Sequence, residues 1–360
     1  MNSRKDICSK FNFVGEFISA EPYGGGHIND TYKVVYKDGN KENLYILQRI
    51  NSNVFKNPEQ VMENIGKVTA YLNKMEMDSQ YEVMELIYTK DNQTFYREDG
   101  DFYRAFVFVK DAVSYDYSKD LETIFESGKA FGNFQKMLAN FPLDELHETI
   151  PNFHHTYERY KTFCKSLEKD AHFRKDECLN EIKFALGHED LTHLVVDEME
   201  KGTVPVRVTH NDTKINNVLF DVNSGKGKCV IDLDTVMPGS ALYDYGDSIR
   251  SSAATAIEDE PDLEKVWWDK DRFTAFTKGY LSEMAGALTE KEKELLPYAG
   301  ILITYEIGLR FLTDYLDGDT YFKIHYPTHN LVRAKNQFKF VADMEKHIDE
   351  IKQIVKDCLA

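Results

Sequence analysis

Four side chains in the middle of the sequence have the types and spacing that phosphoryl transfer requires. The run 210–217 contains Asp212 and, five residues further on, Asn217, and a second run reads Asp232-Leu233-Asp234. Phosphoryl transfer uses a carboxylate that orients the attacking hydroxyl and accepts its proton, and oxygen ligands that hold magnesium on the nucleotide phosphates. Asp212 suits the first role, and Asn217 and Asp232 suit the second.

The segment between these two runs predicts a hairpin that brings them together. Residues 217–222 favour a strand, residues 223–227 are turn formers (Asn-Ser-Gly-Lys-Gly), and residues 228–233 favour a returning strand. Antiparallel pairing would place Asn217 and Asp232 at the same metal ion, and strand alternation would turn Asp234 to the face of Asp232. The pattern therefore predicts a metal site at one end of a small sheet.

A simpler interpretation is that these residues only cap and terminate turns. Asp and Asn are common in loops for that reason, and a single Asp would be read that way. The ordered combination of His-x-Asp, an Asn five residues later, a hairpin and Ile-Asp-x-Asp fits the phosphotransfer template much better.

This ordered set resembles the aminoglycoside phosphotransferase and choline kinase families. Their signature is a His-x-Asp with an Asn five residues after the Asp, followed by Ile-Asp-x-Glu or Ile-Asp-x-Asp. The resemblance implies that Asp212 is the catalytic base, that Asn217 and Asp232 bind Mg2+, and that Asp234 binds a second metal ion or the substrate. It also implies that the segment 244–247 (Asp-Tyr-Gly-Asp) braces the catalytic loop.

Further segments resemble the N-acetylhexosamine 1-kinases, and the similarity extends over nearly the whole chain. These segments are residues 21–32, 209–217, 231–240, 310–312 and 319–322. The resemblance implies transfer of the γ-phosphoryl group of ATP to the anomeric C1 hydroxyl of GalNAc or GlcNAc. It also implies that His27, Arg310 and Tyr321 join Asp212 in the sugar-binding pocket, near the acetamido group.

Each of these three pocket residues also has an ordinary structural interpretation. His27 follows three glycines and could be an exposed turn residue. Arg310 could form an ion pair with Glu306, four residues before it on the same helix. Tyr321 follows a turn, where its ring could stack on a sugar face or simply pack against the protein.

The nucleotide contacts are expected at two backbone segments. Gly24, Gly25 and Gly26 lie between two strand-like runs, where backbone amides can approach phosphates, although a tight hairpin needs the same glycines. The second segment is the junction of the two lobes, where the backbone of Phe108, Val109 and Lys110 would contact adenine.

One position departs from the wider kinase pattern. The strand 45–49 has Gln48 where a phosphate-binding Lys is expected, and Arg49 is one residue out of register. Strand alternation places the two on opposite faces, so only a bulge or shifted pairing would let Arg49 replace the lysine. The glutamate that would partner such a lysine is also open, with Glu59 and Glu63 as candidates.

The pattern of apolar residues changes along the chain and divides it into two lobes. Residues 1–110 alternate strand-like runs, including 81–88 and 102–109, with one helical segment at 58–75 and an Asp38-Gly39 hairpin signal. Residues 111–360 are mostly helical, with helices expected, among others, at 176–201 and 332–359. We therefore predict an α/β (α+β), two-lobed protein-kinase-like fold, with a small N-terminal nucleotide-binding lobe and a larger C-terminal catalytic and sugar-binding lobe.

Composition excludes several other classes of function. The 360 residues carry a formal net charge of −17, which disfavours a broad nucleic-acid or anionic-membrane surface. Five cysteines with no close pair predict reduced thiols, and residues 1–10 lack the apolar core of a signal peptide. No run approaches 18 apolar residues, so we expect a cytoplasmic protein whose partners are ATP and a small molecule. The oligomeric state is not indicated.

Three alternatives remain open from the sequence. The catalytic motif does not specify the acceptor, so an aminoglycoside, choline or homoserine kinase would share it. A non-catalytic nucleotide- or sugar-binding protein is suggested only by Gln48. The third alternative is a metal site at residues 147–155, which contain three histidines and a glutamate. Their spacing fits no helical pair of metal ligands, and Pro151 interrupts them.

Overall fold

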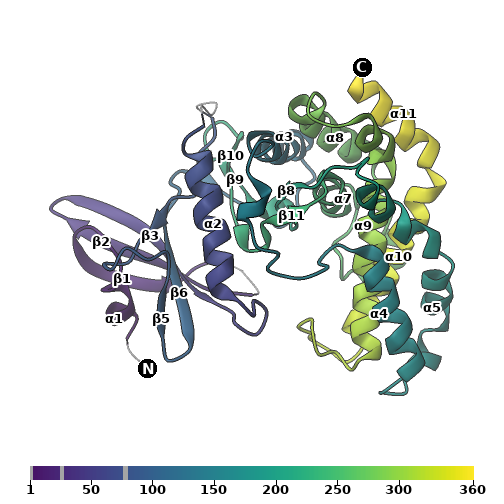
Figure 1. Cartoon of the computed structure of the whole chain (residues 1–360), viewed down its shortest axis with the longest axis horizontal. Coiled ribbons are helices and arrows are strands. Elements are labelled where there is room, and N and C mark those ends of the chain that lie inside the picture. Colours follow the sequence, from purple (N-terminus) through teal and green to yellow (C-terminus); the bar gives the residue numbers. More distant parts are fainter. Residues whose placement is uncertain (1–2, 25–27, 76–79) are drawn as a thin grey trace.

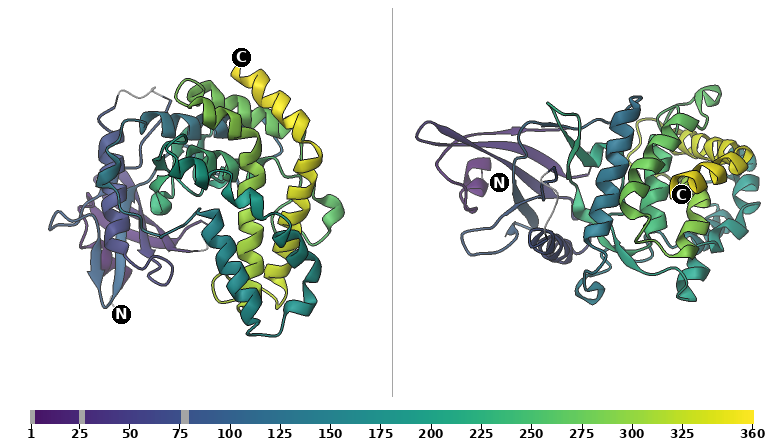
Figure 2. Two further views of the ribbon diagram at one scale, coloured as in Figure 1. Left: turned by 45° about the vertical axis from the view of Figure 1, so that its right-hand side comes forward. Right: turned by 90° about the horizontal axis from the view of Figure 1, so that it is seen from above.

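The chain folds into two lobes that differ in secondary structure. The structure, a computed structural model, describes residues 3–24, 28–75 and 80–360. An antiparallel sheet forms the N-terminal lobe and a group of helices forms the C-terminal lobe (Figure 1). Seen from above, the strands occupy one end of the molecule and most of the helices the other (Figure 2, right). The α+β, two-lobed kinase-like architecture predicted from the sequence is confirmed.

The N-terminal lobe contains a six-stranded sheet with the order β1-β2-β3-β6-β4, and β5 also pairs with β6. Its elements are α1 (Arg4–Cys8), β1 (Glu16–Pro22), β2 (Asp30–Asp38), β3 (Lys41–Ile50), α2 (Pro58–Leu72), β4 (Leu86–Ile87), β5 (Tyr96–Glu98) and β6 (Asp101–Val107). The predicted hairpin is present: Asp38 pairs with Lys41, and Gly39 in the turn between them has a φ of 60°. A positive φ of this kind is what a two-residue hairpin turn requires.

The C-terminal lobe contains most of the helices and two small sheets. Its strands are β7 (Ala112–Val113), β8 (Arg207–Thr209), β9 (Val218–Asp221), β10 (Gly227–Val230) and β11 (Met237–Gly239). Its α-helices are α3 (Leu121–Met137), α4 (Thr156–Lys169), α5 (Leu179–Leu186), α6 (Val196–Glu200), α7 (Ala241–Ser252), α8 (Lys270–Met284), α9 (Glu290–Leu316), α10 (His329–Lys346) and α11 (Ile348–Leu359). Short 3-10 helices are η1 (Leu143–Glu145), η2 (Lys175–Glu177), η3 (Glu189–His193), η4 (Ile215–Asn217), η5 (Leu233–Thr235) and η6 (Leu263–Lys265).

Two of the expected helices are broken, and one expected strand is shorter. The predicted helix 176–201 is divided into η2, α5, η3 and α6, because α5 ends at Gly187 and the ring of His188 bonds to the carbonyl of Phe184 at 2.7 Å. The predicted helix 332–359 is interrupted at His347, whose ring bonds to the carbonyl of Asp343 at 2.9 Å. Of the expected strand 81–88, only β4 pairs with a neighbouring strand.

The two lobes share one hydrophobic cluster, which fixes the sheet relative to the catalytic segments. It combines Ile65 of α2 and Phe106 of β6 with Phe134 of α3 and Leu233 of η5, all buried. A polar contact adds to it: Asn64 on α2 donates to the carbonyls of His147 and Val236 at 2.8 and 2.9 Å. Helix α2 therefore belongs to the core of both lobes.

Helix α3 reaches the catalytic segments and is held there by α8. The two helices approach so closely that a Cβ atom on Gly128 would lie 2.4 Å from the carbonyl oxygen of Phe276, and one on Gly279 would lie 2.0 Å from that of Phe125. Only glycine allows this approach.

Helix α9 crosses the centre of the C-terminal lobe. Among the described helices it alone is long and apolar enough to cross a bilayer, but 83% of its most apolar window is buried inside the fold. Its apolar side chains thus form the core of the lobe.

Candidate active site

The loop between β8 and β9 holds Asp212 in a small polar group. Asn217 donates from Nδ2 to the carbonyl oxygen of Asp212 at 2.8 Å and to its Oδ2 at 3.1 Å. Lys214 lies 2.9 Å from the other carboxylate oxygen, Oδ1. Asp212 and Asn217, five residues apart in the sequence, are therefore in direct contact.

Neighbouring positive charge keeps the Asp212 carboxylate ionised. Burial raises its pKa, but the charge and hydrogen bond of Lys214, followed by the charges of His210 and Arg250, outweigh burial and hold the pKa below its usual value. An ionised carboxylate with partial solvent access can accept a proton from a bound hydroxyl.

The predicted hairpin brings Asp232 next to this group. β9 and β10 pair antiparallel with Val218 opposite Val230, and the amide of Ile231 donates to the carbonyl of Asn217 at 2.9 Å. Asp232 follows directly with a left-handed φ of 61° and begins the 3-10 turn η5. The prediction that Asp232 and Asp234 alternate along one strand is wrong, because the strand ends at Val230 and the chain turns at Asp232.

Three carboxylates crowd this turn. The surrounding protein limits the hydration of Asp232 even though its side chain keeps solvent access, and Asp234 and then Asp212 add repulsion. Together they raise the pKa of Asp232 to about 7. A cation bound beside Asp232 would relieve this repulsion.

Asp234 points away from the turn toward the N-terminal lobe. Its Oδ1 pairs with Nη1 of Arg104 on β6, and its Oδ2 accepts from Asn29 at 2.7 Å. Nε of Arg104 donates to Gln48 on β3 at 2.9 Å, and Gln48 donates to Thr31 on β2 at 3.0 Å. Both oxygens of Asp234 are thus bonded to N-terminal residues, and a metal role for Asp234 stays a prediction.

The structure shows which cation lies beside Gln48 in place of the expected lysine. β2 and β3 pair without a bulge through Gln48 and Arg49, so Arg49 stays on the opposite face, where it pairs with Asp30. Glu59 and Glu63 on α2 pair with Arg97 and His147. The cation beside Gln48 is Arg104, its cross-strand neighbour on β6.

Sequence reasoning missed Arg104, although the sequence contains a signal for it. An arginine in the middle of an otherwise apolar strand, Phe102 to Val107, must find an acidic partner if both faces of the strand are buried. Lys214 was also missed: it is two residues from Asp212 and sets the charge state of its carboxylate.

Asp244 at the start of α7 braces the catalytic loop, as the sequence led us to expect. Its two carboxylate oxygens accept from the backbone amides of His210 at 2.8 Å and Asn211 at 2.7 Å, and Gln135 of α3 donates to it at 2.6 Å. Its own carbonyl accepts from Thr213 at 2.5 Å. The buried side chain of Asp244 therefore fixes the backbone of the catalytic loop.

Three of the predicted nucleotide-binding residues, Phe108, Val109 and Lys110, lie where the two lobes connect. Phe108 follows β6, and its ring contacts Tyr23 at 5.6 Å in an edge-on arrangement. Val109 and Lys110 lead to β7, which pairs with β9 of the C-terminal lobe. Gly24 has a φ of 75°, a conformation that favours glycine. Gly25, Gly26 and His27 lie outside the described residues.

Arg310 and Tyr321 line a pocket of about 260 Å³ at the end of α9. Arg310 lies over the rings of Phe153, Tyr321 and Phe322, with centroid distances of 5.0, 5.7 and 5.6 Å. The alternative ion pair with Glu306 does not form, since Glu306 bonds to His154 and Thr156. The Tyr321 ring is 57% exposed, so it is free to contact a ligand.

A buried carboxylate holds the loop that carries Tyr321. Asp314, one turn after Arg310 on α9, accepts from the consecutive backbone amides of Thr320, Tyr321 and Phe322 at 2.8, 2.8 and 2.9 Å. Asn330 donates to the same carboxylate at 2.9 Å. This segment lies on the side of the helical lobe that faces the N-terminal lobe (Figure 1).

His154 connects helix α9 to the catalytic loop. One ring nitrogen bonds to Glu306 at 2.7 Å, and the other lies 3.3 Å from the carbonyl oxygen of Asn211. The histidine-rich segment 147–155 is thus used in structural contacts, with His147 bonded to Glu63. Within the described ranges no group of three His, Cys, Asp or Glu side chains is arranged to bind a metal ion.

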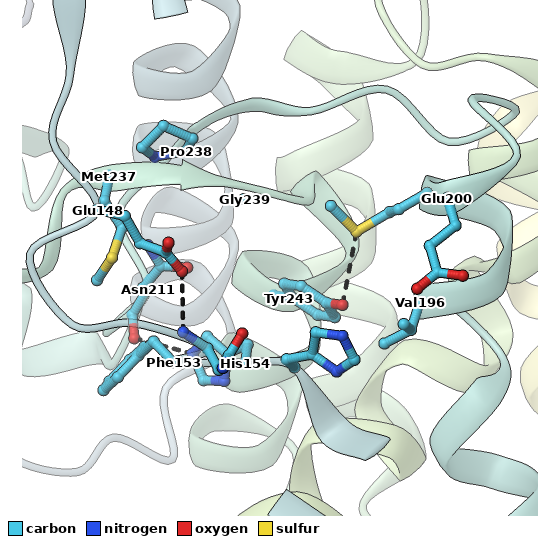
Figure 3. Close-up of a pocket in the computed structure, with 13 residues that line it drawn as sticks. Glu148, Phe153, His154, Val196, Glu200, Asn211, Met237, Pro238, Gly239 and Tyr243 are labelled. Atoms are coloured by element: carbon cyan, nitrogen blue, oxygen red, sulfur yellow. Dashed lines mark hydrogen bonds between the residues drawn. The ribbon is translucent and has the colours of Figure 1, made fainter. Parts of the chain in front are cut away.

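A second, larger pocket of about 310 Å³ adjoins the same loop (Figure 3). Asn211, Met237 and Tyr243 line it, but Asp212, Asn217 and Asp232 do not. These three predicted site residues therefore lie outside this pocket.

The fold and these contacts define a protein-kinase-like phosphotransferase. The model of the phosphotransferase enzyme family matches residues 19–272, which include the N-terminal sheet, the catalytic loop and the hairpin. The chain belongs to this family and is a phosphotransferase that acts on an alcohol group. Arg310 and Tyr321 lie beyond the matched residues.

Solved structures of small-molecule kinases share the fold. A microcompartment-associated aminopropanol kinase is 16% identical, with a TM-score of 0.63 and 97% of each chain covered. Spectinomycin phosphotransferase, in complex with ADP and spectinomycin, is 13% identical with a TM-score of 0.58, covering 97% of this chain and 99% of the other. Ethanolamine kinase from Plasmodium vivax is 14% identical with a TM-score of 0.56, covering 91% and 83%.

Proposed function

We propose that this phosphotransferase transfers the γ-phosphoryl group of ATP to the anomeric C1 hydroxyl of an N-acetylhexosamine, GalNAc or GlcNAc. The observation that carries the proposal is the pocket at the end of α9, where two arginines lie close together without carboxylate partners. The resemblance of the segments around Arg310 and Tyr321 to N-acetylhexosamine 1-kinases supports the same assignment.

The hydrogen-bond donors of this pocket suit an acceptor with a carbonyl group. Nε and Nη2 of Arg159 both donate to the carbonyl of Phe153, Nη2 at 2.9 Å. Arg310 has only a 3.5 Å contact with the hydroxyl of Tyr321. Neither arginine forms an ion pair with an acid among the described residues, and each lowers the pKa of nearby Glu306. An acetamido oxygen would accept a hydrogen bond from a guanidinium group there, where the carboxylates of Asp314 and Asp317 also line the pocket.

Asp212 is proposed to orient the C1 hydroxyl and accept its proton. Its carboxylate is ionised by Lys214 and held by Asn217, so its direction is fixed before the acceptor binds. The nucleotide is proposed to lie between the lobes, with its adenine at the backbone of residues 108–110 and its phosphates near Gly24–Gly26.

The residues at the hairpin fit magnesium. Asn217 uses its amide N–H groups on Asp212, which keeps its oxygen available, and burial followed by repulsion from Asp234 and Asp212 raises the pKa of Asp232. Mg2+ is usually held by one or two carboxylates together with substrate phosphates, which is the donor set available here. When bound, it would neutralise charge on the transferring phosphoryl group.

The test is ATP consumption by the purified protein with a panel of acceptors: GalNAc, GlcNAc, galactose, glucose, choline, ethanolamine, homoserine and kanamycin. We expect GalNAc and GlcNAc to have much higher specificity constants than galactose or glucose, and phosphorus NMR to show an anomeric phosphate. Equal constants for galactose and GalNAc, or turnover of an amine and of no hexose, would reject the sugar assignment. No ATP consumption with any acceptor would favour a binding protein.

A further inference from the structure

Arg104 is the largest fully buried side chain of the described residues, and it crosses from one lobe to the other. Its side chain is 2% exposed and that of Asp234 is 4% exposed. A buried guanidinium is costly unless a carboxylate and further hydrogen bonds satisfy it. Asp234 supplies the charge and Gln48 supplies a carbonyl oxygen at 2.9 Å.

Asp234 receives contacts from separate parts of the N-terminal lobe. Arg104 lies on β6, and Asn29 lies directly before β2. Asn29 is itself fixed, because its Oδ1 accepts from the amide of Asn51 after β3 at 3.0 Å. The carboxylate therefore joins Arg104 of the sheet and Asn29 to the turn that carries Asp232.

We propose that Arg104 and Asp234 form an inter-lobe bridge that positions the nucleotide-binding lobe over the metal-binding turn. Arg104 supplies the cation beside Gln48, but its buried side chain is bonded to Asp234 and Gln48 and not to a phosphate; Asp234 acts as the partner of Arg104 and not as a metal ligand. Both are positioning residues: they act through Asp232, two residues before Asp234, and through the segment that follows Gly24–His27. The inference rests on the phosphotransferase activity and not on the identity of the acceptor.

A bridge between Arg104 and Asp234 and a metal-binding role for Asp234 predict different effects of removing each residue. If Asp234 bound magnesium, its loss would raise the magnesium requirement and the loss of Arg104 would not. If the two residues form one bridge, removing either one leaves the same defect. Removing both leaves little more, because the contact is already absent.

The experiment compares Arg104→Gln, Asp234→Asn, the double variant and Asp232→Asn. Calorimetry measures ADP affinity over a magnesium titration, which needs no acceptor. The unfolding temperature without any ligand shows how much the bridge contributes to the stability of the protein. We expect each bridge variant to lose about tenfold in ADP affinity at saturating magnesium and to unfold at a lower temperature, since the nucleotide then meets two lobes that are not held together. The double variant should match the more affected single variant.

The magnesium titration distinguishes a metal-binding role, proposed for Asp232, from a bridging role, proposed for Asp234. Asp232→Asn should shift the magnesium concentration for half-maximal ADP binding upward by about tenfold or more, whereas the bridge variants should leave it in place. An upward shift for Asp234→Asn with none for Arg104→Gln would overturn the proposal, as would additive losses in the double variant.

Two milder variants keep the test decisive if a charged residue left alone in the core prevents folding. Arg104→Lys retains the charge and can still reach one carboxylate oxygen, so it should recover part of the ADP affinity lost in Arg104→Gln. Asn29→Ala removes one contact to Asp234 without leaving a buried charge, and should weaken ADP binding by about threefold. Wild-type ADP affinity in both Asn29→Ala and Arg104→Lys would reject the bridge.

Discussion

The catalytic loop and the proposed acceptor pocket are built in opposite ways. In the catalytic loop, Asp244 accepts two backbone amides within 2.8 Å, and the carbonyl of His210 accepts from Thr235 at 2.6 Å. In the pocket, Arg310 contacts three aromatic rings, and its hydrogen bond to the hydroxyl of Tyr321 is 3.5 Å long. The loop is thus rigid and satisfied before any ligand binds, whereas the pocket retains donors for a ligand.

This difference separates the reaction from its specificity. Groups that perform the transfer must be held in place, because small displacements lower the rate strongly. Groups that select the acceptor must keep unsatisfied hydrogen-bonding capacity, because discrimination comes from bonds that only the right acceptor completes. Changes in the loop should therefore affect all acceptors alike, and changes in the pocket should affect some acceptors more than others.

Asp212→Asn should have the largest effect. We expect turnover to fall by about 10²- to 10⁴-fold with every acceptor, because the amide cannot accept the hydroxyl proton. ADP affinity should remain close to that of the unchanged protein. Steady-state kinetics and calorimetry check this, with Asp349→Asn on the exposed surface as the control. Turnover near the normal rate would remove Asp212 from its role.

Asp244→Asn should have the next largest effect, through the shape of the loop. One carboxylate oxygen becomes an NH2 group that faces a backbone N–H, so a buried donor loses its partner at a cost of about 1–3 kcal/mol. We expect a lower unfolding temperature and a turnover reduced by about 10- to 100-fold, equally for all acceptors. If the reduction differed between GalNAc and galactose, the separation between loop and pocket would be wrong.

The sequence predicted the loop better than it predicted the inter-lobe contacts. Asp212, Asn217 and Asp232 are joined by a short hairpin whose turn residues are explicit, so local pattern was enough to bring them together. The pairing of Arg104 with Asp234 depends on the register between β3 and β6 and on how the lobes meet, across 130 residues of sequence. No local pattern carries that information.

The helices show the same limit at their ends. Apolar periodicity predicts a helix at 290–315, which agrees within one residue with α9, but it could not detect the ends of α5 and α10. There, single side chains, those of His188 and His347, bond to the backbone and allow the chain to turn. Such bonds depend on tertiary packing, which overrides helical pattern.

Arg310→Ala tests the pocket half of the comparison. We expect the preference for GalNAc over galactose to shrink by about tenfold, while turnover of galactose changes little, since the acetamido oxygen loses its donor. Arg310→Lys is the matched variant: it keeps the charge but not the planar group that lies among three rings, and should recover only part of the preference. An equal loss with both sugars would place Arg310 among the structural residues.

Asp314→Asn should have the smallest effect and would show how the pocket is held. Asp314 lines the same pocket as Arg310, and its carboxylate accepts the amides of residues 320–322 and so fixes the loop that presents Tyr321. An asparagine keeps one acceptor oxygen, so we expect the loop to loosen and the KM for GalNAc to rise roughly threefold, with kcat unchanged, as for the loss of about one hydrogen bond. Asp317→Asn is the control at the same end of α9, because its carboxylate accepts from Ser166 at 2.9 Å and not from the loop, so its effect should be smaller. Hydrogen exchange of the amides of residues 320–322 should accelerate in Asp314→Asn and not in Asp317→Asn. A fall in kcat without a change in KM would instead connect this loop to the transfer step, and the two regions would then not be independent.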